Sequence, residues 1–368
     1  MNLFDYLEWR GDVGFDISPV TTEDLAIFAQ LVYCPFEDAM NEDYSGKTLG
    51  ELQSLVYRSG KPRNDWSWQK SLFQLWTGIP EYKRFADVKL DNFVSNFVPS
   101  IDKQFSAATF GIGDEAVVAF RGTDLSIVGW RENFEMAYHA PVPSHMDAVA
   151  YLNAVSSKYK KLYVCGHSKG GNLALYAAAF AKNKDRIESI VNFDGPALDK
   201  KTYLSQWKSI KDKVETYIPQ NSIVGMTMGY GGNFAVVKSG ETGMLAHDQF
   251  TWEIEHRHFK TSELSETSRF IYRVMHDFME ESTPEEIEIL VRTIFKVLDE
   301  LKAEDVDSLK EALENNLLGT INLLRNLDQD EKTILERLIE RIKNEGAESV
   351  KLLISKNSFK LMEWLKNL

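Results

Sequence analysis

The sequence G-H-S-K-G at residues 166–170 constrains the fold of this chain more than any other feature. It follows the apolar segment 161–166 and precedes the helix-forming run 173–181. Glycines two positions before and after a serine let the backbone pass closely on both sides of a sharp turn from a strand into a helix. The pattern predicts that Ser168 is a nucleophile at a helix N-terminus, where free amides favour negative charge.

Two further observations bear on this motif. Short motifs of this kind also arise by chance, but the flanking strand and helix, with small residues at Gly171 and Ala174, argue against chance here. His167 precedes the serine on the same turn, so its ring is expected to point away from Ser168 and to have a structural role.

The segments around the motif predict an α/β fold with a mostly parallel sheet. Residues 105–112 and 115–122 are typical of two strands joined by the two-residue turn Gly113-Asp114. Further strands are expected at 161–166, 186–193, 213–218 and 233–239, with helices at 147–158, 170–182 and 199–212 between them. The first hundred residues are predicted to be mainly helical.

Strand signals end near residue 260, and the rest of the chain is predicted to be helical. Thr283-Pro284-Glu285-Glu286 is a capping box with proline at the first helical position, and an apolar stripe follows it. Similar stripes occupy 306–326, 329–343 and 346–367. We therefore expect an α/β-hydrolase-type domain over residues 1–281, with a helical N-terminal region over residues 1–100, and a C-terminal helical bundle or extension over residues 282–368.

Composition excludes several classes of function. A net charge of −13 argues against general binding to nucleic acid or to anionic membrane surfaces, because both need basic patches. The sequence has no run of 18 apolar residues and no signal-peptide pattern, so no stable membrane insertion is expected. Cys34 and Cys165 have no disulfide or metal-ligand spacing. These features favour a cytoplasmic protein without a metal or cofactor.

A serine nucleophile needs a base, which follows it in the chain order Ser, acid, His. Four histidines come later in the sequence. His256 and His258 lie among charged residues typical of a solvated surface, and His276 falls in a predicted helix. His247 follows the last predicted strand through a glycine-containing loop and is the preferred base. The alternative is a loop histidine without a catalytic role.

The oxyanion of an acyl-transfer intermediate needs two amide donors. One is the amide of the residue after the nucleophile, Lys169. The segment F-R-G-T-D at 120–124 ends a predicted strand and offers the second, Thr123, whose hydroxyl can assist its amide.

These motifs resemble a known class of enzymes. The pairing of AFRGTD with Gly129-Trp130 and then GHSKGGNLA resembles the class 3 lipases, which include the fungal triacylglycerol lipases. The chain to about residue 260 is similar to a bacterial family labelled as a domain of unknown function, through YLEWRGD, AFRGTD, GHSKGGNLA, NFDGPAL and PQNSIVG. The resemblance implies an α/β-hydrolase core with Ser168 as nucleophile, His247 as base, and Thr123 and Lys169 as oxyanion donors. It also implies that residues 125–137 occupy the place of the lipase lid.

The sequence departs from the lipase pattern at the acid of the triad. Ser222 stands where that pattern has an aspartate, after the predicted strand 213–218. Asp194 ends the preceding strand and is the preferred substitute, since neighbouring strand ends converge. It fits a structural role in an Asp-Gly-Pro turn equally well. Asp248 would have to fold back onto His247 and ranks lower, while Ser222 or water would orient the histidine but stabilise its imidazolium less.

The sequence therefore predicts a serine hydrolase that cleaves a small-molecule acyl ester, thioester or lipid-like substrate without a cofactor. A different interpretation is a non-catalytic α/β-hydrolase-like binding module, whose C-terminal helices contact a protein partner. A third is an amidase or peptidase, which the motif alone does not exclude.

Overall fold

The computed structural model describes residues 1–39, 44–58, 67–123, 127–136, 139–198, 204–226, 234–300 and 326–344. The chain divides into two compact units. The first joins residues 1–123 with 143–264, and the second joins 124–142 with 265–368. Each unit is therefore built from segments that are separate in the sequence.

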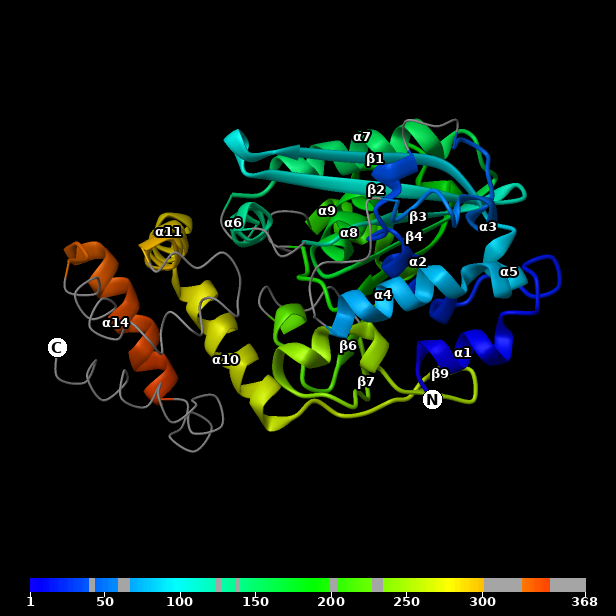
Figure 1. Cartoon of the computed structure of the whole chain (residues 1–368). Coiled ribbons are helices and arrows are strands. Elements are labelled where there is room, and N and C mark those ends of the chain that lie inside the picture. The colour runs from blue at the N-terminus through cyan, green and yellow to red at the C-terminus, as the bar shows by residue number, and fades with distance from the viewer. Residues whose placement is uncertain are drawn as a thin grey trace. The chain divides into compact units, whose positions relative to one another are not determined.

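The first unit contains a seven-stranded sheet with the strands in the order β1 to β7 (Figure 1). Strands β1, β2 and β3 pair antiparallel, whereas β3 to β7 pair parallel. A short ribbon of β8 and β9 lies outside this sheet. The strands are β1 (Lys89–Val98), β2 (Lys103–Ile112), β3 (Glu115–Phe120), β4 (Lys161–His167), β5 (Ile187–Phe193), β6 (Val214–Pro219), β7 (Phe234–Val237), β8 (Ile254–Glu255) and β9 (His258–Phe259). The predicted mostly parallel sheet and its hairpin are confirmed.

Helices cover both faces of the sheet. The N-terminal helices are α1 (Leu3–Arg10), α2 (Thr22–Leu31), α3 (Leu49–Leu52), α4 (Ser67–Gly78) and α5 (Lys83–Ala86), and those between strands are α7 (Pro143–Ser156), α8 (Lys169–Phe180) and α9 (Leu204–Ile210). Tyr163 and Cys165 of β4 pack in the core with α2. Because successive side chains of a strand point to opposite faces, Leu162 and Val164 face the other way. β4 is therefore buried from both sides, as parallel strands usually are.

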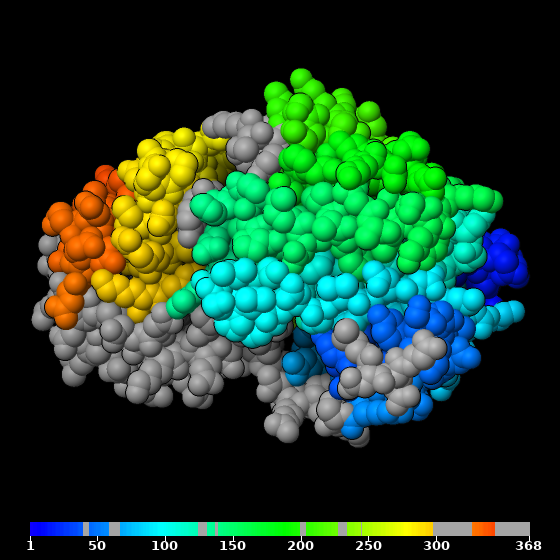
Figure 2. Space-filling model, turned by 90° about the horizontal axis from the view of Figure 1, so that it is seen from above, coloured from blue at the N-terminus to red at the C-terminus, as the bar shows by residue number. Residues whose placement is uncertain are grey.

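The edge strand β1 was not predicted, because the first hundred residues were expected to be mainly helical. In β1 the pairing with β2 shifts between Leu90 and Asn92, so a bulge interrupts the alternation of apolar residues. Ser95 and Asn96 weaken the pattern further. In the view of Figure 2, β1 (cyan) runs along the surface beside α7 (green), where the Tyr151 hydroxyl donates to the carbonyl of Asn92 at 3.1 Å.

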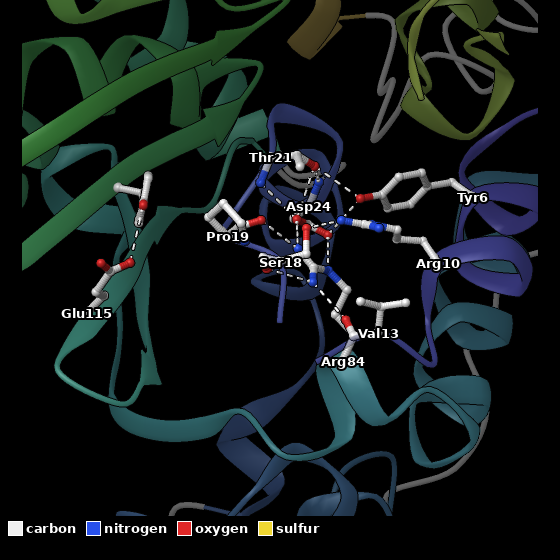
Figure 3. A network of polar contacts seen from close by, with 10 residues as sticks. Tyr6, Arg10, Val13, Ser18, Pro19, Thr21, Asp24, Arg84 and Glu115 are labelled. Atoms are coloured by element: carbon white, nitrogen blue, oxygen red, sulfur yellow. Dashed lines mark hydrogen bonds and ion pairs between the residues drawn. The ribbon is translucent and has the colours of Figure 1, made fainter. Parts of the chain in front are cut away.

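A buried ion pair holds the N-terminal helices together (Figure 3). Arg84 of α5 donates to both carboxylate oxygens of Asp24 in α2, at 2.8 and 2.5 Å, and neither side chain is exposed. The other guanidinium hydrogens bond the carbonyls of Val13, Ser18 and Pro19. The Tyr6 hydroxyl also donates to Asp24, at 3.0 Å, and burial with the nearby carboxylate raises the pKa of Tyr6.

Replacing Arg84 with methionine is expected to lower the free energy of unfolding by about 3–5 kcal/mol, because the Asp24 carboxylate stays buried without its partner. Urea denaturation measures this loss. The matched control is Lys160→Met, which breaks the exposed pair with Asp114 and should change stability little. Equal effects of the two substitutions would contradict the prediction.

The second unit packs the insertion 124–142 with the C-terminal helices. Its described helices are α6 (Ile127–Glu135), α10 (Glu266–Glu281), α11 (Pro284–Glu300) and α14 (Gln329–Asn344). Phe134 of α6 packs against an apolar cluster of α11, and its ring lies 5.6 Å from that of Phe295. The Arg131 guanidinium lies 5.5 Å from the same ring. The segment expected in the place of the lipase lid thus belongs to the unit that contains the tail.

The unit boundary lies at residue 265, whereas the sequence suggested 282. The capping box at Thr283 is present, since its hydroxyl accepts from the Glu286 amide at 3.3 Å. A capping box marks the start of a helix, however, and α10 already packs with α11 and α14 through Phe278. The helix predicted at 329–343 corresponds to α14, while those at 306–326 and 346–367 fall almost wholly outside the described residues.

Replacing Phe295 with aspartate is expected to release α6 from α11, because a buried charge replaces the ring that Phe134 and Arg131 contact. Limited proteolysis should then cleave within residues 124–142 faster than in the unchanged protein. The control is Arg292→Asp, one turn earlier on the exposed side of α11. Similar cleavage rates in both variants would show that α6 does not depend on this contact.

Candidate active site

Ser168 lies on the turn between β4 and α8, with φ +58° and ψ −133°. Residues with a side chain rarely adopt a positive φ, so the serine is strained. A Cβ atom at Gly166 would collide with the backbone of Gly170, and one at Gly170 would collide with the carbonyl of Phe120. The two glycines therefore let the turn pass directly against the end of β3.

The loop after β3 lies against the serine. A Cβ atom at Gly122 would stand only 3.1 Å from the Cβ atom of Ser168. Thr123 comes next, and its buried hydroxyl has no hydrogen-bond partner among the residues that the structure describes. The backbone amide of Lys169 is at the first position of α8, where the helix offers it no acceptor. The buried Lys169 ammonium donates to the carbonyl of Gln104 at 2.6 Å.

Asp194 lies at the end of β5 and contacts His247. The carboxylate is fully buried, and its Oδ2 accepts from His247 Nδ1 at 2.6 Å. The Ser222 hydroxyl and the Gly225 amide donate to Oδ1, at 2.5 and 3.2 Å. With its proton on Nδ1, the imidazole has its lone pair on Nε2, the atom that can accept a proton from a hydroxyl.

The turn that carries Ser168 and the turn that carries Asp194 touch through the backbone. The Ser168 amide donates to the carbonyl of Phe193 at 2.9 Å, and a Cβ atom at Gly195 would collide with the Ser168 carbonyl. The residues on either side of Asp194 thus contact the turn that carries Ser168. Phe120, His167 and Phe193 also end three adjacent parallel strands, which is the edge where α/β sheets place ligands.

His167 connects the serine turn to His247. The two rings lie 4.3 Å apart, and His167 Nε2 donates to the carbonyl of His247 at 2.8 Å. Burial, with His247 as a smaller cause, lowers the pKa of His167 well below its usual value. A neutral His167 with its proton on Nε2 can accept from the Tyr33 hydroxyl through Nδ1, at 3.4 Å. The ring of His167 therefore supports His247.

The remaining residues that the sequence offered as candidates lie elsewhere or act differently. Ser222 is a hydrogen-bond donor to Asp194. Asp248 accepts from the Phe250 amide at 2.9 Å and caps the short turn Gln249–Thr251, and burial raises the pKa of Asp248 to about 6. His258 is 79% exposed, and His276 lies on α10 of the second unit. No local sequence pattern predicts the contacts of Gly225 and Tyr33, because only the tertiary fold brings these two residues to the site.

The described ranges contain no group of three His, Cys, Asp or Glu side chains that could hold a metal ion. Cys34 and Cys165 are both buried free thiols. Over the same residues, no helix has the length and apolar character needed to cross a bilayer.

A strained serine between a strand and a helix, on a mostly parallel sheet covered by helices on both faces, defines the α/β-hydrolase fold. The chain belongs to the Mbeg1-like family, whose model matches residues 79–296. No curated protein matched the sequence.

Two similar solved structures are fungal lipases. Lipase II from Rhizopus niveus is 17% identical, with a TM-score of 0.38, over 60% of this chain and 83% of that chain. A triacylglycerol lipase from Penicillium expansum is 15% identical, with a TM-score of 0.31, over 45% of this chain and 72% of that chain.

Proposed function

We propose that this protein is a serine hydrolase that cleaves carboxylic esters or thioesters. Ser168 is the nucleophile, His247 the base and Asp194 the acid. The observation that supports this assignment is the 2.6 Å hydrogen bond between Asp194 Oδ2 and His247 Nδ1, beside the strained serine turn. A buried carboxylate on Nδ1 holds the histidine in the tautomer that a serine needs.

The proposed reaction is transfer of the acyl group to Ser168 and then to water. His247 Nε2 takes the proton from Ser168 Oγ as the oxygen attacks the carbonyl carbon of the substrate. The oxygen of the tetrahedral intermediate accepts hydrogen bonds from the amides of Thr123 and Lys169, and the Thr123 hydroxyl is a third donor. The imidazolium then protonates the departing alcohol or thiol. Water, deprotonated by His247, attacks the acyl-serine and releases the carboxylic acid and the free serine.

The acid comes from β5 instead of β6. The lipase pattern places an aspartate at the position of Ser222, but here the Ser222 hydroxyl donates a hydrogen bond to Asp194. With the Gly225 amide and the His247 ring, it gives the carboxylate three donors. A buried carboxylate held on Nδ1 can stabilise the imidazolium form of the base during the reaction.

Labelling with a fluorophosphonate probe tests the proposal, because only an activated serine reacts quickly with it. p-Nitrophenyl esters from acetate to palmitate, matched thioesters and matched anilides then separate an esterase from an amidase. The matched variants are His247→Gln, expected to lose labelling and turnover, and His258→Gln at an exposed histidine, expected to keep both. A folded protein that neither labels nor turns over any substrate would contradict the proposal and favour the non-catalytic binding module.

A further inference from the structure

The turn that carries Asp194 is held by polar side chains that take no part in the proposed reaction. Asn192 bonds Gly195 twice: its Nδ2 donates to the Gly195 carbonyl and its Oδ1 accepts from the Gly195 amide, both at 2.9 Å. Asn172 of α8 donates from Nδ2 to the carbonyls of Pro196 and Ala197, each at 3.2 Å. Both asparagines are buried, so each bond is shielded from competing water.

His145 of α7 completes this set of contacts. Its Nε2 lies 2.7 Å from Asn172 Oδ1. Because the amide nitrogen of Asn172 already donates to two carbonyls, its oxygen must accept, and His145 Nε2 therefore carries the proton. The His145 ring stacks on Tyr176 of α8, with centroids 4.1 Å apart, which fixes the direction of its N–H group. His145 is 1% exposed.

The turn needs this support because Asp194 itself is strained. Its φ is +47°, in the left-handed region that costs a residue with a side chain roughly 1–2 kcal/mol. A turn relaxed toward negative φ would carry the carboxylate away from His247. A shift of about 1 Å at a catalytic group can cost about 10²-fold in rate. The contacts of Asn172 with the two residues that follow Gly195 oppose such a shift.

We propose that Asn172 and His145 are positioning residues: they hold the turn after β5 so that Asp194 stays bonded to His247. The inference rests on the proposed function, and it assigns a role to Asn172 of the GHSKGGNLA motif. His145 orients the side chain of Asn172, and Asn172 holds the carbonyls of residues 196 and 197. The turn that contains these carbonyls then positions the carboxylate of Asp194.

The test compares Asn172→Ala and His145→Phe with the unchanged protein. We expect kcat to fall by about 10- to 100-fold in Asn172→Ala while KM stays constant, since no substrate contact is lost. His145→Phe keeps the stacking on Tyr176 and should show a smaller fall. In the Asn172→Ala background, His145→Phe should cause no further fall in kcat, because His145 acts through Asn172. The downfield NMR signal of the His247 Nδ1 proton should shift or broaden in both variants.

The control is Asn153→Ala. Asn153 also lies on α7 and accepts from the Lys182 amide at 2.8 Å, just beyond the C-terminal end of α8. The Asn153→Ala substitution should leave kcat and the His247 signal unchanged.

Unchanged kcat and an unchanged signal in folded His145→Phe and Asn172→Ala would overturn the positioning role. If Asn172→Ala does not fold, the result for His145→Phe alone decides. The NMR signal needs no turnover, so a shifted signal in a protein without hydrolase activity would overturn the proposed function and leave the positioning role standing.

Discussion

Replacing Ser168 with alanine is expected to abolish fluorophosphonate labelling and to lower kcat for ester hydrolysis by about 10⁶-fold, as removal of a catalytic serine does. The melting temperature should change little. Alanine keeps the Cβ atom and the strained backbone, and the only atom removed is the hydroxyl oxygen. Labelling kinetics, ester turnover and thermal unfolding measure the three quantities.

Two further variants sharpen this prediction. Ser189→Ala removes a serine hydroxyl from the middle of the neighbouring strand β5 and should leave labelling intact. Ser168→Gly removes the nucleophile and also the penalty of a positive φ, so its free energy of unfolding should rise by about 1 kcal/mol. Labelling of Ser168→Ala at the wild-type rate would refute the assignment of the nucleophile.

Replacing Asp194 with asparagine is expected to lower kcat by ~10²-fold or more, toward the about 10⁴-fold loss known for a triad aspartate. The surroundings decide which way the amide points. Ser222 and Gly225 both donate to Oδ1, so the amide oxygen will take that place. The NH₂ group then faces His247 Nδ1 and donates to it. The imidazole must carry its proton on Nε2, where it can no longer accept the proton of Ser168.

Asp248→Asn is the matched control, because Asp248 is adjacent to His247 in sequence but caps the Phe250 amide. It should change kcat by less than about threefold, well below the loss from a triad acid. A similarly small effect of Asp194→Asn would mean that Asp194 is a structural turn residue. Ser222→Asp in the Asp194→Asn background would then test whether position 222 can supply the acid, as in the lipase pattern.

Local sequence patterns were enough to predict much of the first unit. The glycines around Ser168 are needed by the turn itself, because any Cβ atom there would meet backbone. The turn at Gly113-Asp114 and the alternation of strands and helices likewise depend on neighbouring residues. The same reasoning predicted the start of α11 at Thr283, since a capping box involves only one helical turn.

Long-range contacts decided the rest. The sequence left three possible partners for His247, namely Asp194, Ser222 and Asp248. The residues around each of them do not show which strand ends lie together in the fold. Folding brings Asp194 and Ser222 together although they are 28 positions apart, and it turns Asp248 toward its own helical turn. The bulged edge strand β1 could not be predicted from its own sequence pattern, because its pairing with β2 stabilises it.

The same contrast applies to the division of the chain. The sequence by itself determined that apolar stripes in the C-terminal region need burial, because isolated amphipathic helices are marginal in water. It did not determine what buries them. Only the tertiary structure decided that Phe295 of α11 packs on Phe134, a residue far earlier in the chain. The periodicity of apolar residues shows which face of a helix is apolar. Which segment covers that face depends on how the side chains of distant segments fit together when they pack.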